Sequence, residues 1–358
     1  MQRLLPPGSY QEWHCSKPVF NITKLFSPEH GLNTKGADGS FQENIKDRIT
    51  GLPVISLYGE KLKPSQHDFS DLDIIVFDIP DVGARFYTYL WSLTYVMEAC
   101  AEHNIPLIIP DRPNPLGGNL LLAEGPILDE KNCSSFIGRW NIPIRHSCTY
   151  GELAKYFSIT KKINLDFTVI KNKNWDRNKS VGEVNWKFTS MSPAISNVET
   201  ALLYSGMGLL EGININEGRG TGTPFKIFGA PWLNSTVLLN EFKLLNLPGT
   251  NASACSYTPN DSLYKNETCN GIKLSITDTE FFKPVLTGLE IIRLVQNHFP
   301  ENCKERLYKT VANPSGKNHL DRLTGVINSF DKIKNEEFLR QHYTTDNWQK
   351  KIKPYLLY

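Results

Sequence analysis

Short apolar runs alternate with amphipathic stretches along the first half of the chain. Four of the runs are PVISLYG (53–59), DIIVFDI (73–79), IPLIIPD (105–111) and DFTVIK (166–171). A fifth leads into residue 27 through Val19, Phe20, Ile22, Leu25 and Phe26. Continuous runs of this kind are typical of strands buried on both faces, as in a parallel sheet. We therefore predict a strand at each run.

Helical periodicity separates these runs. Residues 86–104 carry an apolar face made of Leu90, Leu93, Val96, Met97 and Cys100. A second helix is predicted from Thr149, because Thr149 and Glu152 have the spacing of a capping box. Strands alternating with helices favour βαβ units, so we predict a Rossmann-like, mostly parallel sheet as the first domain.

The pattern changes after about residue 186. Two further capping-box spacings, Ser196 with Glu199 and Thr287 with Glu290, predict the starts of helices, the latter continuing as 289–298. A strand is predicted over 271–278, and the chain ends in helical patterns. The resulting prediction is an α/β chain with two domains, a Rossmann-like domain over residues 1–188 and a smaller α+β domain over 189–358.

Composition narrows the function classes. The chain has 358 residues, of which 40% are hydrophobic and 21% charged, and a formal net charge of +2. This balance is typical of globular proteins and offers no basic surface for nucleic acid. No apolar run approaches the ~18 residues needed to cross a bilayer, and the opening residues lack the apolar core of a signal peptide. We expect neither a nucleic-acid partner nor a membrane span, and the oligomeric state stays open.

Cysteines and sequons leave the compartment undecided. The cysteines are scattered without C-x-x-C spacing, so we expect no metal site and no other cofactor. Cys255 and Cys269 lie close enough in sequence to pair across a loop. Several Asn-x-Ser/Thr triplets would suit a secreted, glycosylated protein, although an asparagine-rich chain contains such triplets by chance.

Three loops at predicted strand ends, residues 25–31, 78–89 and 111–118, concentrate polar side chains. The site candidates on these loops are Glu29, His30, Asp81, Arg85, Tyr87, Asp111 and Asn114. Because neighbouring parallel strands lie only ~5 Å apart, we expect the loops to converge on one crevice at the carboxyl edge of the sheet.

Three of these candidates also have a structural interpretation. Asp81 could cap the helix that follows it, Asp111 could pair with Arg112 to hold its loop, and Arg85 could lie on the surface. A structural role for Glu29 is harder to accept, because a turn between proline and glycine needs no carboxylate.

A glycine-rich loop, NEGRGTGTPF (216–225), contains Glu217, Arg219 and Thr221. It lacks the residue order of a P-loop and the strand-to-helix setting, so nucleotide binding is disfavoured. Arg219 stands between two glycines, where its guanidinium is well suited to bind a carboxylate or phosphate through two hydrogen bonds.

Taken in order, these motifs resemble those of the exo-β-N-acetylmuramidases of the NamZ family. The resemblance runs from about residue 25 to 358 and rests on LFSPEHG, TGLPVISLYG, FDIPDVGARFYTY, DRPNPLGG, EGPILD, EGININEGRGTGTPF with GAPW, and YLLY. It implies a Rossmann-like domain, a smaller second domain and an active site in the cleft between them. The implied reaction is hydrolytic release of N-acetylmuramic acid from the non-reducing end of peptidoglycan fragments, which favours a secreted or extracytoplasmic location over a cytoplasmic one.

The resemblance also implies roles. Glu29 would be the general acid, with His30 beside it, and Asp81 and Glu217 are candidates for the second carboxylate that glycosidases often use. The lactyl carboxylate of muramic acid would give Arg85 or Arg219 a function. The expected substrate-binding residues are Arg85, Tyr87, Asp111, Asn114, Arg219 and Thr221.

Two alternatives accompany this interpretation. Family members carry a further βα unit before the LFSPEHG strand, so we expect either a truncated start, which would also account for a missing signal peptide, or a sheet that has lost a strand. An inactive muropeptide-binding protein is the rival function, and in it Glu29 would not affect binding. An unrelated α/β hydrolase or transferase is disfavoured, because the chain has no G-x-S-x-G motif.

Overall fold

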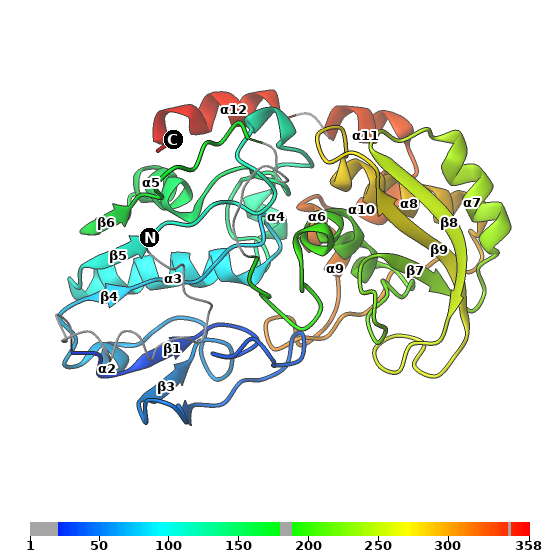
Figure 1. Cartoon of the computed structure of the whole chain (residues 1–358). Coiled ribbons are helices and arrows are strands. Elements are labelled where there is room, and N and C mark those ends of the chain that lie inside the picture. The colour runs from blue at the N-terminus through cyan, green and yellow to red at the C-terminus, as the bar shows by residue number, and fades with distance from the viewer. Residues whose placement is uncertain (1–20, 180–187, 343–344) are drawn as a thin grey trace.

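The computed structural model describes residues 21–179, 188–342 and 345–358 as a mixed α/β structure with parallel strands and covering helices (Figure 1). Val19 and Phe20, which belong to the fifth apolar run, and the first of the scattered cysteines, Cys15, lie outside these residues. The buried apolar side chains of the first and second halves form one continuous cluster. The site described below is therefore built on a shared core.

The predicted strands of the first half are all present, although each is shorter than its apolar run. Their bounds are β1 (Leu25–Ser27), β3 (Pro53–Ser56), β4 (Ile75–Val76), β5 (Leu107–Pro110) and β6 (Phe167–Ile170). β1 pairs with β3 in parallel, and β4, β5 and β6 pair in parallel, so the predicted parallel pairing is confirmed. These strands belong to two separate sheets, however, and not to the single sheet predicted. The sequence did not predict β2 (Ile45–Lys46), which adds to β3 in antiparallel orientation.

Two long helices of the first half match the predictions. α3 (Thr88–His103) buries the predicted apolar face. α5 (Tyr150–Thr160) begins with the predicted capping box, in which the Thr149 side chain accepts from the Glu152 amide and the Glu152 carboxylate accepts from the Thr149 amide. Shorter helical turns are α2 (Gln66–Phe69), η1 (Leu120–Leu122) and α4 (Glu130–Cys133).

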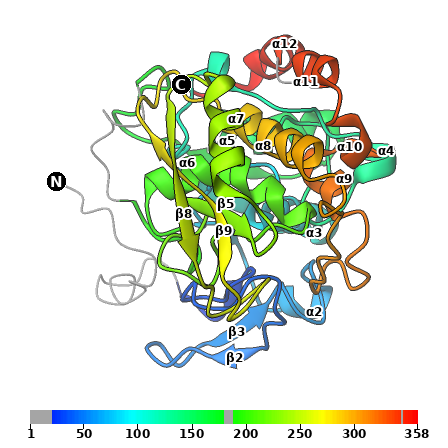
Figure 2. The same ribbon diagram turned by 90° about the vertical axis from the view of Figure 1, so that its right-hand side faces the viewer.

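The second half is built on an antiparallel sheet with the order β7-β9-β8. The strands are β7 (Ile227–Ala230), β8 (Thr250–Tyr257) and β9 (Cys269–Ile276), and α7 (Ser235–Leu244) packs on β8 and β9 (Figure 2). Of these elements the sequence predicted β9 alone. β8 has only one buried position, so it lacks the apolar run that marks the other strands.

Close helix packing in this half depends on two glycines. α6 (Val198–Met207) lies against α8 (Pro284–His298). A Cβ at Gly206 would stand 1.9 Å from the carbonyl oxygen of Pro284, and a Cβ at Gly288 would stand 2.3 Å from that of Gly206. No other residue permits this approach.

Two predicted capping boxes are wrong. α6 is capped by Asn197, whose side chain accepts from the Thr200 amide, because the asparagine next to Ser196 competes for the same role. α8 starts at Pro284, so Thr287 lies inside the helix and donates to the Lys283 carbonyl. Proline at the first turn of a helix is the stronger start signal here.

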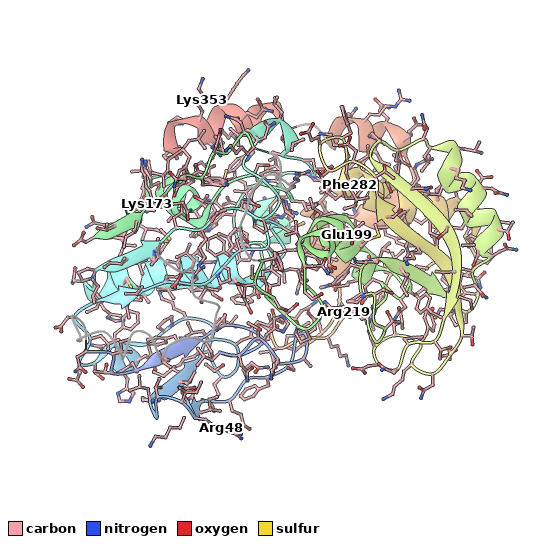
Figure 3. All side chains as sticks on the ribbon, in the orientation of Figure 1. Arg48, Lys173, Glu199, Arg219, Phe282 and Lys353 are labelled. Carbon is pink, nitrogen blue, oxygen red and sulfur yellow. The ribbon has the colours of Figure 1, made fainter. Side chains whose placement is uncertain are left out.

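The chain ends in helices, as predicted, and then returns to the first half. These elements are α9 (His319–Thr324), α10 (Ser329–Lys332), α11 (Glu336–His342), α12 (Asp346–Ile352) and η4 (Lys353–Tyr355). The rings of Trp348 and Tyr355 each pack edge-on at 5.3 Å from Tyr156 of α5. Figure 3 accordingly shows Lys353 on the same side of the molecule as Lys173.

Cys255 and Cys269 are both free thiols. On the paired strands β8 and β9, Cys255 stands opposite Gly271, and Cys269 stands opposite Tyr257. The two thiols are thus offset by two positions, which is why they do not pair.

Among the described helices, none has the length and hydropathy of a membrane span.

Candidate active site

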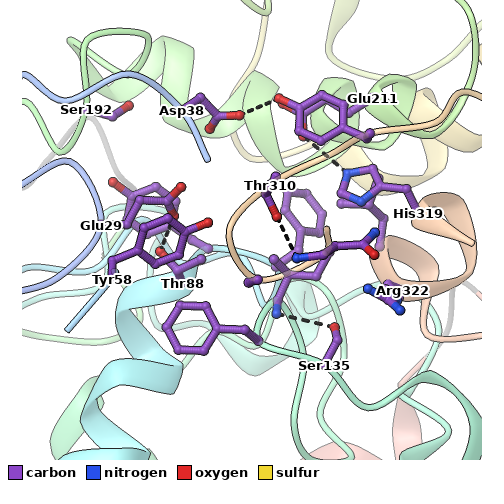
Figure 4. A pocket seen from close by; sticks show the side chains of 18 of the residues that line it. Glu29, Asp38, Tyr58, Thr88, Ser135, Ser192, Glu211, Thr310, His319 and Arg322 are labelled. Atoms are coloured by element: carbon purple, nitrogen blue, oxygen red, sulfur yellow. Dashed lines mark hydrogen bonds and ion pairs between the residues drawn. The ribbon is translucent and has the colours of Figure 1, made fainter. Parts of the chain in front are cut away.

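A pocket lies where the first loops, the start of α3 and the segment leading into α9 meet (Figure 4). The polar side chains that line it include Glu29, His30, Asp38, Tyr58, Tyr87, Thr88, Glu211, Arg219, Tyr308, His319 and Arg322. Four of the residues predicted from sequence are therefore in the pocket, namely Glu29, His30, Tyr87 and Arg219.

Glu29 follows β1 directly, and Pro28 ends that strand. The residue is 5% exposed. Its Oε1 accepts from the Gly39 amide at 2.8 Å and its Oε2 accepts from the Thr88 hydroxyl at 2.7 Å. Burial raises the pKa of the Glu29 carboxyl, and the negative charge of Asp38 adds to this effect. Glu29 is therefore placed to hold a proton, as a general acid must.

His30 turns the chain back toward this carboxyl group. The residue has φ +67°, a left-handed conformation made acceptable by the tight turn through Gly31. Its Nδ1 lies 2.8 Å from the Gly36 carbonyl oxygen, and because a carbonyl can only accept, Nδ1 carries the hydrogen. The ring stacks on Tyr87 at 6.5 Å, which fixes its orientation.

Asp38 and Glu211 are pocket carboxylates that the sequence did not predict, and Asp38 lies nearest to the Glu29 loop in the pocket wall. Its side chain is 29% exposed, and it accepts from Arg219 Nη2 at 3.0 Å and from the Tyr308 hydroxyl. Burial would raise the pKa of Asp38, but Arg219 and the Tyr308 hydroxyl outweigh it, so the pKa lies below its usual range. The Asp-Gly pair carries the sequence signature of a turn, and no local pattern marks it as a site residue.

Glu29, His30 and Asp38 each offer a ligand atom, and these atoms lie within 4.8 Å of one another. Among the described residues, these three side chains form the cluster whose ligand atoms are close enough together to hold a metal ion. Both oxygens of Asp38 and Nδ1 of His30 already have protein partners, however. The cluster is thus organised as a hydrogen-bonded network, and the expectation of no metal stays a prediction.

Arg219 is surrounded by acids. Besides Asp38, its guanidinium contacts Glu211 Oε1 at 2.8 Å and Glu217 Oε1 at 3.2 Å. Glu217 also contacts Arg306 Nη1 at 3.2 Å and is fully buried, and burial raises the pKa of its carboxyl. Glu217 is not among the lining residues, so it supports Arg219 from behind the pocket wall.

Asp81 and Arg85 point into the protein interior. Asp81 Oδ1 accepts from the Val82 amide at 2.7 Å, and its Oδ2 lies 3.4 Å from His146 Nε2. The side chain does not cap α3, whose N-cap is Tyr87. Arg85 is 0% exposed, so it is not a surface residue, and it donates to the carbonyls of Pro126, Ile142 and Leu323. Neither residue lines the pocket.

The third predicted loop and Thr221 also lie away from the pocket. Asp111 accepts from the Thr149 hydroxyl, the Gly151 amide and the Tyr358 hydroxyl, and thereby ties the C-terminus to α5. The Asn114 side chain bonds the Cys148 carbonyl and the Leu116 amide. Thr221 donates to the Gly218 carbonyl within its own loop.

The alternative that Asp111 pairs with Arg112 is wrong. Arg112 instead contacts Asp78 Oδ1 at 2.6 Å. The three predicted loops therefore converge only in part: the first loop and the start of α3 reach the pocket, while the third loop packs against α5.

Three pocket residues come from a segment that no sequence pattern singled out. Tyr308 lies between α8 and α9, and His319 and Arg322 lie on α9. The Tyr308 and His319 rings stack at 4.5 Å and 10°. A lone aromatic, histidine or arginine carries no positional signal in a single sequence, so these residues emerge only when the chain folds.

Comparison with known proteins gives one consistent family. The N-terminal model of the family described as exo-beta-N-acetylmuramidase NamZ matches residues 11–199, and its C-terminal model matches residues 202–358. The peptidoglycan beta-N-acetylmuramidase NamZ of Bacillus subtilis strain 168 is 39% identical over 348 residues, which cover 95% of this chain and 81% of that protein.

Two solved structures are similar as well, both of DUF1343 family proteins from Bacteroides fragilis NCTC 9343. The first has a TM-score of 0.84 at 27% identity and covers 98% of this chain and 89% of its own. The second has a TM-score of 0.68 at 29% identity, and the match covers 95% of this chain and 86% of the chain in that structure. Since the family models together span nearly the whole chain and the Bacillus relative exceeds one third identity, the protein belongs to the exo-beta-N-acetylmuramidase NamZ family.

Proposed function

We propose that this protein is an exo-acting glycoside hydrolase that releases N-acetylmuramic acid from the non-reducing end of peptidoglycan fragments. The observation that carries the proposal is the pair Glu29 and Asp38, which face one pocket with their pKa values displaced in opposite directions. A glycosidase needs one protonated and one ionised carboxyl group at the same bond. Family membership supplies the substrate class.

Glu29 is assigned as the general acid. It donates its proton to the leaving glycosidic oxygen as the bond from that oxygen to C1 of the muramic acid breaks, and water supplies the hydroxyl that C1 gains. The Thr88 hydroxyl and the Gly39 amide hold the carboxyl group in one orientation. His30 fixes the adjacent turn through Gly36.

Asp38 is assigned as the second carboxylate, in place of Asp81 and Glu217, which lie outside the pocket lining. A carboxylate oxygen of Asp38 lies within 4.8 Å of one of Glu29. Two carboxyl groups with oxygens this close favour the ~5 Å arrangement of retaining glycosidases over the roughly 6.5–9.5 Å of inverting ones. Arg219 and Tyr308 keep Asp38 ionised.

We also propose the finer architecture, with two domains over residues 1–188 and 189–358 and the active site in the cleft between them. The ion pair of Asp38 with Arg219 supports this arrangement, because it joins the two halves across the pocket. The helix α12 packs against the first domain, although its sequence belongs to the range of the second. An extracytoplasmic location fits a peptidoglycan substrate, with recovery of fragments in the cytoplasm as the alternative.

The test is release of sugar from 4-nitrophenyl N-acetyl-β-muramide and from the muramic acid–glucosamine disaccharide. The wild-type protein should hydrolyse both, and Glu29→Gln should lower the rate about 10²–10⁴-fold, the usual contribution of a general acid. Glu60→Gln, which changes a carboxylate outside the pocket lining, is the matched control. An inactive muropeptide-binding protein would instead release no sugar while folded and would bind it equally well with glutamine at position 29.

A further inference from the structure

Muramic acid differs from glucosamine by a lactyl ether on C3, which carries a carboxylate. An enzyme specific for muramic acid therefore needs a cation that is free to meet this group. The question of which residue does so rests on the proposed function and deepens it. Charge-assisted hydrogen bonds between a guanidinium and a carboxylate are the strongest means available.

The two arginines expected from sequence to play this role already have partners. Arg219 contacts the carboxylates of Asp38, Glu211 and Glu217, so a further carboxylate there would meet repulsion from three acids. Arg85 is fully buried behind the wall, and its Nη atoms donate to main-chain carbonyls.

Arg322 is different. It lines the pocket and is half-buried, yet its side chain makes no hydrogen bond or ion pair with any part of the chain that the structure describes. Among the described residues, Arg219 and Arg322 are the arginines of the pocket lining, and none of the described lysines lines it. Arg322 is thus a lining cation whose charge the described protein leaves uncompensated.

His319 provides a second ring that can donate a hydrogen bond, on the same face of α9 and three residues before Arg322. It is only 4% exposed, and neither ring nitrogen has a hydrogen-bond partner in the described chain. Its Nε2 stands 3.8 Å from Glu211 Oε2, too far for a hydrogen bond. Burying an imidazole whose ring nitrogens make no hydrogen bond costs free energy, and a ligand in the pocket would supply a hydrogen-bond partner.

The surrounding protein holds α9 rigidly. Arg85 Nη2 donates to the Leu323 carbonyl at 2.8 Å, and the Asp321 carboxylate accepts from the amides of Asn328 and Ser329. Figure 4 shows Arg322 and Glu29 on opposite sides of the pocket, with Thr310 between them. A sugar whose C1 lies at Glu29 could therefore direct its C3 substituent toward α9.

We propose that Arg322, assisted by His319, binds the lactyl carboxylate of the substrate and so selects muramic acid over glucosamine. This assigns substrate discrimination to α9 and acid catalysis to the Glu29 loop. The two segments are distant in sequence, so mutations can test substrate discrimination and acid catalysis separately.

The kinetic test compares the 4-nitrophenyl β-glycosides of N-acetylmuramic acid and N-acetylglucosamine. For Arg322→Gln, the ratio of kcat/KM for the muramide to that for the glucosaminide should fall about 10- to 100-fold, mainly through KM, as expected for a lost charge-assisted bond. Arg322→Lys should recover part of the ratio. Lys317→Gln removes an exposed charge near α9 that is outside the pocket lining and is the matched control.

Calorimetry in the Glu29→Gln background separates recognition from hydrolysis. Free N-acetylmuramic acid should bind more tightly than N-acetylglucosamine, and Arg322→Gln should abolish that difference. Equal losses for both sugars, or no loss for either, would overturn the assignment even if the wild-type enzyme is active. Absence of hydrolysis by the wild type would count against the proposed function, while the binding difference would still decide the role of Arg322.

Discussion

The guanidinium of Arg85 donates a 2.8 Å hydrogen bond from Nη2 to the main-chain oxygen of Leu323, across 238 positions of sequence. Arg85 stands just before α3, and Leu323 follows Arg322 on α9. Arg85 was one of the residues expected to bind substrate, and this bond connects it to the helix that we propose binds substrate. Arg85 is thus placed to support the site from inside.

Replacement of Arg85 should therefore destabilise the fold. Arg85→Met leaves the buried carbonyls of Pro126, Ile142 and Leu323 without their donor, and we expect the free energy of unfolding to fall by roughly 2–4 kcal/mol. Urea denaturation measures the change. Arg48→Met, at the exposed position labelled in Figure 3, should change stability by less than about 0.5 kcal/mol. Similar stability of both variants would contradict this role.

The activity should have a bell-shaped pH dependence. Asp38 must be ionised, and its pKa lies below the usual range. As the pH is raised from strongly acidic values, Asp38 loses its proton and activity should increase. Glu29 must be protonated, and its pKa is raised, so activity should fall as the pH rises through that value. A profile of kcat/KM against pH tests both limbs.

Tyr308→Phe should shift the acidic limb of that profile to higher pH. The Tyr308 hydroxyl donates to Asp38 and favours its ionised form, so its loss should raise the pKa of Asp38. Tyr264→Phe is the matched control, because the Tyr264 hydroxyl bonds Asn214 and Trp232 away from the pocket lining. An acidic limb that stays in place in Tyr308→Phe would assign it to another group.

Glu29→Gln should make the protein more stable at neutral pH while it lowers the rate of hydrolysis. Because burial raises the folded-state pKa of Glu29 above its ordinary value of 4.5, the folded protein binds the proton more tightly than the unfolded chain. The contribution of the Glu29 proton to wild-type stability is therefore lost progressively as the pH rises from about 4.5 through the folded-state pKa. Glutamine does not titrate, so the Tm of Glu29→Gln should exceed that of the wild type by an amount that grows over this pH range. Below about pH 4.5 the difference should vanish. A variant that is less stable at every pH would refute this.

Hydrolysis should proceed with retention of configuration at C1. The short separation of Glu29 and Asp38 carries this prediction. Proton NMR of the first product formed from the chromogenic muramide should show the β anomer before mutarotation. Initial appearance of the α anomer would instead require a water between more distant carboxylates and would remove Asp38 from the assigned role.

Local patterns predicted local structure well. The apolar runs gave strands because a buried strand needs apolar residues on both faces, and Thr149 with Glu152 formed their capping box because both bonds close within one turn. The boxes at Ser196 and Thr287 failed where a neighbouring Asn197 or Pro284 offered a better start. Exposed β8 had no apolar run to reveal it.

The sequence by itself determined the parallel strands and long helices of the first half, the family, and Glu29 in a turn between proline and glycine. Tertiary structure decided which polar side chains share a pocket: it placed Asp38 against Arg219 across 181 positions, turned Asp81 and Arg85 inward, and left Arg322 unpaired among the described residues. Element formation depends on hydrogen bonds and periodicity within a few residues. Burial and charge pairing depend on contacts between distant segments, and these set the pKa values and free donors on which the proposed chemistry relies.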